Sequence, residues 1–332
     1  MTPTWTSLLE TARWAPSPHN IQPWRLRVLD DHRAVLLCDG ERLLPETDPS
    51  GRFTMVGLGV FLETLAIAAR AHQADVEADY ALTPLVAGRE LLPFAQLTLK
   101  PAAASEPLGA ELIERRRTSR VPYDGRSVEP ETLAELENVA AAWGQSATFT
   151  TEPELVRFVL DLNRETLFYD LTDDRARREV GSWLRFSARS AAETGDGFSP
   201  AALGFPGWLL LLFFRGRRVF ELPGLRTIVR RLYDRTMRGT RTIGWLEGPF
   251  ETPEDWISSG RMLARLWLTM TAREVALHPF GSIVTNEDAN WRLHERIPHE
   301  TGRGTLWLVF RLGRSAEPPR SHRLTVDELL VR

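Results

Sequence analysis

Residues 15–24 read Ala15-Pro-Ser-Pro-His-Asn-Ile-Gln-Pro-Trp24, with three prolines and four polar side chains in ten residues. The prolines restrict the backbone and end the amphipathic helix that periodicity predicts over residues 6–14. A stiff loop with hydrogen-bonding side chains is suited to a planar heterocycle. The polar heads that it offers are Ser17, His19, Asn20 and Gln22. The alternative interpretation is an ordinary proline-rich turn.

The segments that flank this loop predict an α+β fold built from two similar halves. Alternating polarity predicts strands over residues 25–29, 34–38 and 94–99, and helical periodicity predicts a buried helix over 56–71. The helix predicted over 6–14 is similar in sequence to residues 133–143. The helix over 56–71 and the strand over 94–99 are partly repeated at residues 260–275 and 305–312. We therefore expect two tandem repeats, 1–107 and 108–332, each an antiparallel sheet packed by helices. The alternative is that two helical hairpins merely look alike.

The second repeat is longer than the first. Trp14 matches Trp143 and Gly57 matches Gly260, and the second spacing is the larger. We expect the extra segment at about 170–250, where glycine, proline and aromatic residues crowd together. It contains apolar side chains that do not suit a free surface loop: Phe198, Phe205, Trp208, Leu209 and Phe213. Either they form a lid with glycine hinges, or they form a structural lobe that braces the repeats.

A second polar motif, Arg115-Arg-Arg-Thr-Ser-Arg120, lies where the chain is predicted to leave a helix. Guanidinium groups and hydroxyls match the oxygens of a phosphate, so this segment is a candidate phosphate cradle. Only Lys100 is a lysine, so an anion site in this chain depends on arginine side chains, helix N-termini or backbone amides. The alternative is a solvated charge run at the end of a helix.

The composition is that of a soluble globular protein, with 43% hydrophobic and 26% charged residues in 332. Its 41 basic and 44 acidic side chains give a formal charge of −3, so we expect no nucleic-acid partner. The apolar run Trp208–Phe214 is far shorter than the ~20 residues of a membrane-spanning helix, so we expect no membrane partner. The single cysteine and the absence of a leader-like N-terminus predict a cytoplasmic protein.

Several motifs of common enzymes do not fit. His294 and His299 are five residues apart with Pro298 between them, so they do not form a zinc motif, and we expect no metal site. Gly57-Leu-Gly59 lacks the third glycine of a dinucleotide fingerprint. The sequence contains no Gly-x-Ser-x-Gly elbow and no P-loop.

The two polar motifs together resemble the FMN-dependent nitroreductase family. Residues 15–24 are similar to its Ala-Pro-Ser-x-x-Asn-x-Gln-Pro-Trp signature, and residues 116–120 are similar to its Arg-Arg-Ser-x-Arg segment. Family members are usually homodimers that carry both motifs in one repeat, with the arginine segment first. Here the order is reversed and each repeat keeps one motif. The chain therefore resembles the two-repeat branch of the family, which includes dormancy-associated mycobacterial proteins, and the resemblance implies one composite flavin site in an intrachain pseudo-dimer. We expect a monomer or a weak homodimer.

The resemblance also implies roles for individual residues. Arg116, Arg117 and Thr118 would hold the FMN phosphate and ribityl chain, and Arg120 would face the pyrimidine edge and stabilise negative charge on the reduced ring. From the other repeat, the loop residues Pro16, Ser17, Pro18 and Asn20 would line the ring. The backbone amides of Phe280 and Gly281 would lie near flavin N5. In the C-terminal segment, Arg323, or else Arg320, would close on the phosphate.

The implied activity is FMN-dependent oxidoreduction. Hydride would pass from NAD(P)H through FMN to a nitroaromatic, a quinone or another conjugated small molecule, with no side-chain acid or base required. One alternative is a flavin-sequestering or flavin-free protein whose extra segment blocks the site. Another is a specialised biosynthetic flavin oxidase or dehydrogenase.

Overall fold

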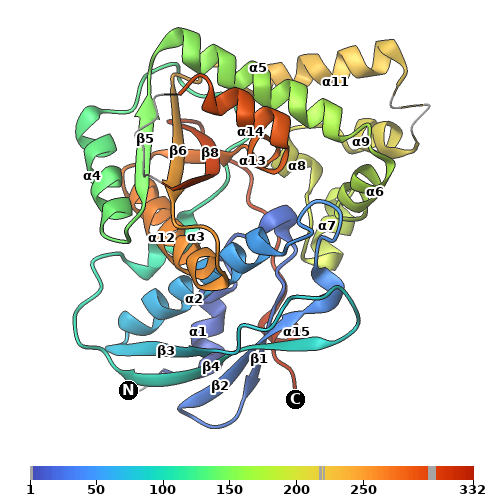
Figure 1. Cartoon of the computed structure of the whole chain (residues 1–332). Coiled ribbons are helices and arrows are strands. Elements are labelled where there is room, and N and C mark those ends of the chain that lie inside the picture. The colour runs from blue at the N-terminus through green and yellow to red at the C-terminus, as the bar shows by residue number, and fades with distance from the viewer. Residues whose placement is uncertain (1–2, 217–218, 220, 298–303) are drawn as a thin grey trace.

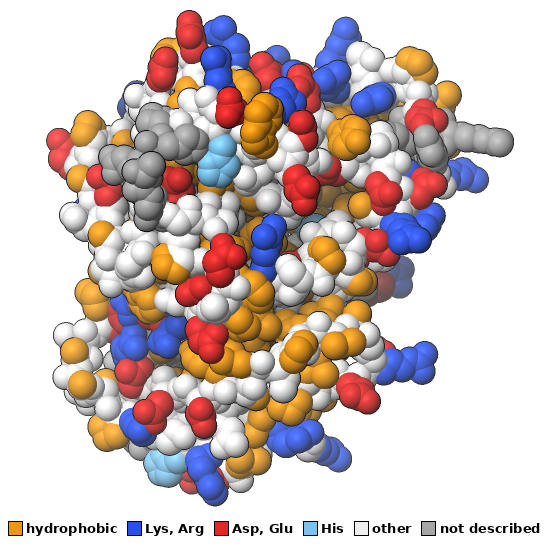
Figure 2. Space-filling model, in the orientation of Figure 1, with side chains coloured by type: hydrophobic (Ala, Val, Ile, Leu, Met, Phe, Trp, Pro, Cys, Tyr) orange, Lys and Arg blue, Asp and Glu red, His pale blue; other side chains and the backbone are white. Residues whose placement is uncertain are grey.

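A computed structural model describes residues 3–216, 219, 221–297 and 304–332. The chain forms two antiparallel sheets with a layer of helices between them, and a group of further helices lies beside the second sheet (Figure 1). Hydrophobic side chains gather in the middle of the face shown in Figure 2, between its upper and lower parts. The architecture is the predicted α+β arrangement.

The first sheet has the strand order β1-β2-β4-β3, and every neighbouring pair is antiparallel. Its strands are β1 (Trp24–Val28), β2 (Arg33–Asp39), β3 (Ala74–Tyr80) and β4 (Leu91–Pro101). The pairing of β2 with β4 shifts register between Leu36 and Leu37. The strands predicted over 25–29, 34–38 and 94–99 are confirmed.

The second sheet repeats this plan. Its order is β5-β6-β8-β7, again antiparallel throughout. Its strands are β5 (Ser146–Thr150), β6 (Thr242–Gly248), β7 (Ala276–Pro279) and β8 (Thr305–Gly313). A register shift lies between Leu246 and Glu247, in the strand pair that corresponds to β2 and β4. Equivalent order and an equivalent irregularity fit a duplicated unit, and the division into 1–107 and 108–332 stays our proposal.

The two halves meet at the helices α2 (Arg52–Arg70) and α12 (Pro253–Ala272). A Cβ on Gly59 would lie 2.2 Å from the carbonyl oxygen of Ile257, and a Cβ on Gly260 would lie 2.1 Å from that of Val56. Only glycine permits this close approach of two helix backbones. The reciprocal contacts make Gly59 the counterpart of Gly260, so the predicted match of Gly57 with Gly260 is wrong by two residues.

A buried ion network also joins these helices. The carboxylate of Glu63 on α2 is 1% exposed and binds Arg261 at 2.8 Å and Arg265 at 2.7 Å, both on α12. Helix α2 has the length and composition of a membrane span, but 89% of that span is buried inside the protein. It is a core helix of the fold.

The extra segment of the second repeat lies between β5 and β6. Its helices are α5 (Pro153–Asp170), α6 (Asp174–Ser182), α7 (Ala188–Thr194), α8 (Pro200–Leu203), α9 (Gly207–Phe214) and α11 (Pro223–Thr236). The predicted range of 170–250 therefore begins too late and wrongly includes β6. That strand is buried at every position, so it lacks the alternation by which an amphipathic strand is recognised.

The apolar side chains of this segment lie in three different environments. Leu209 and Phe213 are buried in an apolar cluster with Phe168 and Tyr233, and Phe205 packs against that cluster. Trp208 is 68% exposed, so the expectation that it packs or covers the site is wrong. Phe198 lies at the candidate site described below.

The remaining short elements connect these parts. They are α1 (Trp5–Ala12), η1 (Pro18–Asn20), η2 (Gly40–Arg42), α3 (Ala110–Arg115), α4 (Pro130–Ala141), α13 (Gly281–Thr285), α14 (Glu287–His294) and α15 (Val326–Leu329). Helices α1 and α4 overlap the similar sequence ranges 6–14 and 133–143.

Candidate functional site

The proline-rich loop is a strained turn between α1 and β1. Three of its residues have positive φ angles, 47° at His19, 57° at Asn20 and 48° at Gln22, where side chains other than glycine are uncommon. Ser17 Oγ accepts a hydrogen bond of 2.9 Å from the Gln22 amide and closes the turn. Such strain persists only where surrounding contacts over-determine the backbone, and it is typical of functional sites.

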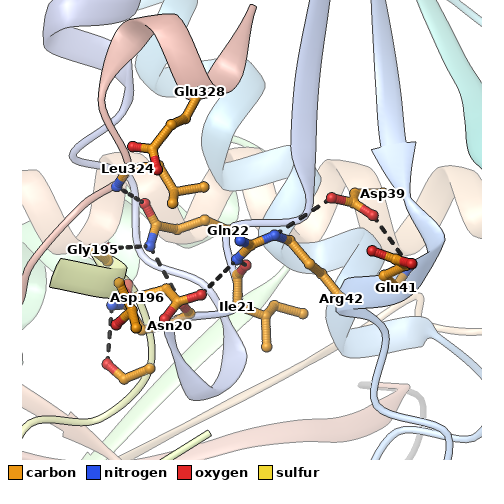
Figure 3. Close-up of polar contacts among 12 residues, drawn as sticks. Asn20, Ile21, Gln22, Asp39, Glu41, Arg42, Gly195, Asp196, Leu324 and Glu328 are labelled. Atoms are coloured by element: carbon orange, nitrogen blue, oxygen red, sulfur yellow. Dashed lines mark hydrogen bonds and ion pairs between the residues drawn. The ribbon is translucent and has the colours of Figure 1, made fainter. Parts of the chain in front are cut away.

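Those contacts come from two distant segments. Gln22 is fully buried; its Nε2 donates to the Gly195 carbonyl at 2.9 Å and its Oε1 accepts from the Leu324 amide at 2.9 Å. Asn20 Nδ2 donates to the carbonyls of Gly197 and His322, each at 3.1 Å. Figure 3 shows the extra segment and the C-terminal segment meeting on this loop.

Ion pairs of Asp196 stabilise the same contact between the loop and the extra segment. Asp196 is buried and accepts a hydrogen bond from Arg42 at 2.9 Å (Figure 3). It accepts another from Arg185 at 2.6 Å. Arg42 also donates to the Ile21 carbonyl at 2.8 Å, so one guanidinium joins the loop to the extra segment. The sequence analysis did not select Asp196 or Arg42, because nothing local relates residues so far apart in the chain.

The arginine segment reaches the first half of the chain at Arg116. Arg116 is buried at the end of α3, and its Nη2 donates to the Trp14 carbonyl at 3.3 Å. The same oxygen accepts from Arg323 Nη2 at 3.4 Å. The Arg116 guanidinium carbon lies 4.5 Å from the ring centroid of Trp267 on α12, which gives a cation–π contact.

These guanidiniums have free donors. Arg116 Nη1 and Arg323 Nε are buried without a hydrogen-bond partner in the described chain. Burial, with Arg323 nearby, lowers the pKa of Arg116 to about 9; burial, with Arg320 and Arg13 nearby, lowers that of Arg323 to about 9. Both values lie above neutral pH, so both side chains stay charged. Two buried cations with unused donors suit an anion with several oxygens.

Arg120 lies at the other end of the segment. Its guanidinium carbon is 5.1 Å from the ring centroid of Phe198, and the Phe198 ring centroid is 5.4 Å from that of His19. Burial lowers the pKa of Arg120 to about 10, and burial together with Arg120 lowers that of His19 to about 4. Asn20 Oδ1 and His19 Nδ1 are buried without partners in the part of the chain described. The loop thus has unused polar atoms close to Arg120 and Phe198.

A further arginine, Arg311, supports this end of the site. It is fully buried on β8, and its guanidinium lies 4.1 Å from the Tyr123 ring centroid. It donates to the carbonyls of Ser119, Val121 and Thr236 and to the Thr240 hydroxyl. Those bonds hold the backbone on both sides of Arg120. The sequence analysis missed Arg311, although a lone arginine in an otherwise apolar strand was a signal.

His278 is a second residue that the sequence analysis did not select for the site. It is buried on β7 and its Nδ1 accepts a hydrogen bond of 3.3 Å from Arg311 Nε. Burial, followed by Arg120 and Arg311, lowers its pKa well below the usual value, so it is neutral at physiological pH. The wall behind Arg120 is therefore polar and positively charged.

Three predicted site residues make other contacts, although one of them, Arg320, lies near Arg323. Arg117 binds Glu317 at 2.7 Å and the Pro318 carbonyl at 2.8 Å, so its guanidinium is engaged by the C-terminal segment. Arg320 is exposed and lies 3.4 Å from the centroid of Trp14. Phe280 is buried in the apolar cluster of the second sheet, and its amide donates to the Val309 carbonyl at 2.7 Å. That amide is not free to donate to a cofactor.

The other predicted residues keep compatible positions. Pro16 and Arg116 line a small cavity with Trp14 and Trp267. A Cβ on Gly57 of α2 would lie 3.3 Å from Pro18 Cδ, so the loop rests against that helix. Thr118 forms a β-bridge with Leu277, next to His278. Gly281 is exposed at the start of α13.

The described residues contain no group of three or more His, Cys, Asp or Glu side chains that could hold a metal ion. His299, one of the two histidines weighed as a zinc motif, lies outside the described residues.

Comparison with known proteins gives relatives that include two proteins named NAD(P)H nitroreductase. The chain is 33% identical over 120 residues to NAD(P)H nitroreductase acg of Mycobacterium tuberculosis, a match that covers 35% of each chain. The matched part of the chain spans about a third of the length of that relative. It is 24% identical over 336 residues to NAD(P)H nitroreductase PigM of Serratia sp., covering 95% of this chain and 90% of that protein.

No family model matches the chain. Among solved structures, the FMN-dependent nitroreductase NfnB of Mycobacterium smegmatis in complex with NADPH aligns with a TM-score of 0.41 at 17% identity, covering 66% of this chain and 94% of that one. The similarity to the two NAD(P)H nitroreductases does not depend on this structural alignment. The resemblance predicted from the two motifs is confirmed: the chain is related to NAD(P)H nitroreductases.

Proposed function

We propose that the protein is an FMN-dependent oxidoreductase of nitroreductase type, which passes hydride from NAD(P)H to a nitroaromatic, a quinone or another conjugated small molecule. The names of its relatives support the activity. When bound, FMN supplies the hydride exchange between a reduced nicotinamide and a conjugated acceptor. The chain supplies binding, orientation and charge.

One observation carries the proposal: buried cations with unused donors meet polar groups from the other half of the chain. Arg116 and Arg323 converge on Trp14, while Arg120 faces the loop that carries His19 and Asn20. A buried charge without a partner is costly, so the fold retains these cations at the expense of stability. The oxygens of a phosphate would accept hydrogen bonds from Arg116 and Arg323. A flavin ring between Arg120 and Asn20 would give the polar groups of the loop hydrogen-bond partners.

The residues then have distinct tasks. Arg116 and Arg323 bind the phosphate through charge-assisted hydrogen bonds. The strained loop, held by Gln22, presents Asn20 in a fixed orientation, and Arg120 places a positive charge at the ring end. Thr118, Pro16, Ser17, Pro18 and the Gly281 amide complete the proposed lining. No side chain is required to transfer a proton to the cofactor.

The test begins with the purified protein and its absorption spectrum. We expect a yellow protein that releases one FMN per chain on denaturation and that bleaches on anaerobic addition of NADH or NADPH. One FMN per chain follows from one loop and one arginine segment. A ratio near two would contradict the composite site, and a protein that neither contains nor takes up FMN would overturn the proposed function.

A flavin-sequestering protein without NAD(P)H turnover is the second candidate. The position of Phe198, against both Arg120 and His19, favours it, because a ring held there would obstruct access by nicotinamide. The same experiment separates the two: a yellow protein that binds one FMN but does not bleach with either nucleotide is a sequestering protein. In both cases we place the protein in the cytoplasm as a single-chain pseudo-dimer with a small-molecule ligand.

A further inference from the structure

The extra segment presents an exposed apolar face on α9. Trp208, Leu211 and Leu212 are 68%, 53% and 37% exposed, and with exposed Arg215 they occupy positions i, i+3, i+4 and i+7 of a helix. These positions share one side of the helix, while Leu209, Leu210 and Phe213 are buried on the other. Both sides of α9 are therefore apolar, and among the described residues only one of them is covered by other parts of the chain.

Leu222, which directly precedes α11, is also 53% exposed. We name Trp208, Leu211, Leu212 and Arg215 the α9 face. Figure 1 places α9 at the edge of the molecule, away from both sheets.

Positive charge accompanies these apolar side chains. The sequence from Trp208 to Thr236 holds seven arginines and two acidic residues, in a chain whose net charge is −3. On α11, Arg230, Arg231 and Arg235 are exposed, as is Ile228 at 52%. In the sequence, the excess of positive charge is therefore concentrated in the segment that carries and follows the exposed tryptophan and leucines.

We infer that the α9 face binds the surface of an anionic phospholipid membrane. Tryptophan and leucine side chains partition into the boundary between headgroups and acyl chains, and arginines bind anionic headgroups. The expected absence of a membrane partner rested on the lack of a spanning segment, and a helix that lies in the interface does not need to span. A second copy of this chain is a poorer occupant, because the arginines of the two copies would repel one another.

Exposed tryptophan alone does not make such a face. Trp291 on α14 is 62% exposed, but Glu287 and Asp288 precede it on the same short helix. An anionic surface would repel those carboxylates. Trp291 is therefore the matched control for Trp208.

The test is flotation of the purified, FMN-loaded protein with vesicles of phosphatidylcholine alone and of phosphatidylcholine with phosphatidylglycerol. We expect binding to the anionic vesicles that weakens at high salt, together with a blue shift of tryptophan fluorescence. The double variant Trp208→Ser/Leu211→Ser should bind at least about tenfold more weakly, since two apolar side chains no longer leave water. Trp291→Ser should bind like the parent.

Three results would overturn the inference. They are absence of binding to the anionic vesicles, equal binding to neutral vesicles, and unchanged binding by the double variant. Light scattering adds a check on self-association: a parent dimer that the double variant converts to a monomer, without vesicle binding, would assign the face to a second copy. Circular dichroism and retained FMN verify that the variants are folded.

Discussion

Asn20 and Gly197 exchange two hydrogen bonds across 177 residues of sequence: the Gly197 amide donates to the Asn20 carbonyl at 3.2 Å, and Asn20 Nδ2 donates to the Gly197 carbonyl at 3.1 Å. Gly197 has a φ of 66°, and a Cβ there would lie 2.4 Å from the Trp183 carbonyl oxygen, so the position requires glycine. The extra segment thus packs directly against the loop of the candidate site.

Asp196→Asn should loosen this wall. Asp196 is buried and pairs with Arg42 and Arg185, so the amide would remove the charge partner of Arg185 and leave Arg42 paired with Asp39 alone. We expect a loss of about 3 kcal/mol in the free energy of unfolding, measured by urea denaturation, and weaker FMN binding. Glu193→Gln breaks the exposed pair with Arg189 in the same segment and should cost less than about 0.5 kcal/mol. Equal stability of the two variants would show that the ion pair does not hold the loop.

Arg116→Met should change cofactor affinity and stability in opposite directions. Loss of the Arg116 guanidinium should weaken FMN binding roughly tenfold to a hundredfold, because a charge-assisted hydrogen bond contributes about 1.5–3 kcal/mol. The flavin-free variant should melt at a higher temperature than the flavin-free parent, because an unpaired buried charge has been removed. Fluorescence titration with FMN and thermal denaturation measure the two effects. Arg115→Met, at an exposed neighbouring position, should change neither the FMN affinity nor the melting temperature. If Arg116→Met lowered both the affinity and the stability, Arg116 would be a purely structural residue.

Phe198→Ala tests whether the extra segment restricts access. Its ring lies against Arg120 and His19, so removal should open the ring end of the site and raise the rate of flavin reduction several-fold. Anaerobic stopped-flow absorbance with NADPH measures that rate. Phe205→Ala, which removes a partly buried ring from the neighbouring apolar cluster, is the control. If both variants reduce at the parent rate, Phe198 is not a gate.

His19→Asn should reduce the acid sensitivity of the fold. Burial, with Arg120 nearby, lowers the pKa of His19 from 6.5 to about 4 in the folded protein. Between these values the unfolded chain binds a proton that the folded chain does not, so stability is lost as the pH falls through this window. The contribution of His19 is about 3 kcal/mol.

Urea denaturation at several pH values measures the slope. Asparagine tolerates the positive φ of residue 19, so the variant should fold. His72→Asn, at an exposed histidine, should keep the slope of the parent. A His19→Asn protein with the parent's full loss of stability would refute the assignment of this window to His19.

Gly59→Ala tests the contact between the two halves. The new Cβ would lie 2.2 Å from the Ile257 carbonyl oxygen, so α2 and α12 would have to separate. We expect a loss of about 3 kcal/mol, visible as a lower melting temperature. Gly224→Ala on α11 meets nothing within 4 Å and should be neutral or slightly stabilising. Equal melting temperatures for both variants would contradict the close approach of the helices.

The sequence by itself determined the local structure and the kind of site. Strands such as 94–99 and the helix over 56–71 follow from hydrophobic periodicity, which depends only on near neighbours. The loop at Asn20 and the segment at Arg116 are short motifs whose chemistry is carried by adjacent residues. Both could therefore be recognised before any fold was known.

Only the tertiary structure decided which of these side chains face one another. Arg116 and Arg117 are adjacent in sequence, yet one lies on Trp14 and the other pairs with Glu317. Arg311, Asp196 and Gly197 join the site from segments that no local pattern connects to it. Their positions depend on the packing of α2 against α12 and of the extra segment against the loop. Such long-range contacts are set by the summed burial of the whole core, and not by the sequence around any one residue.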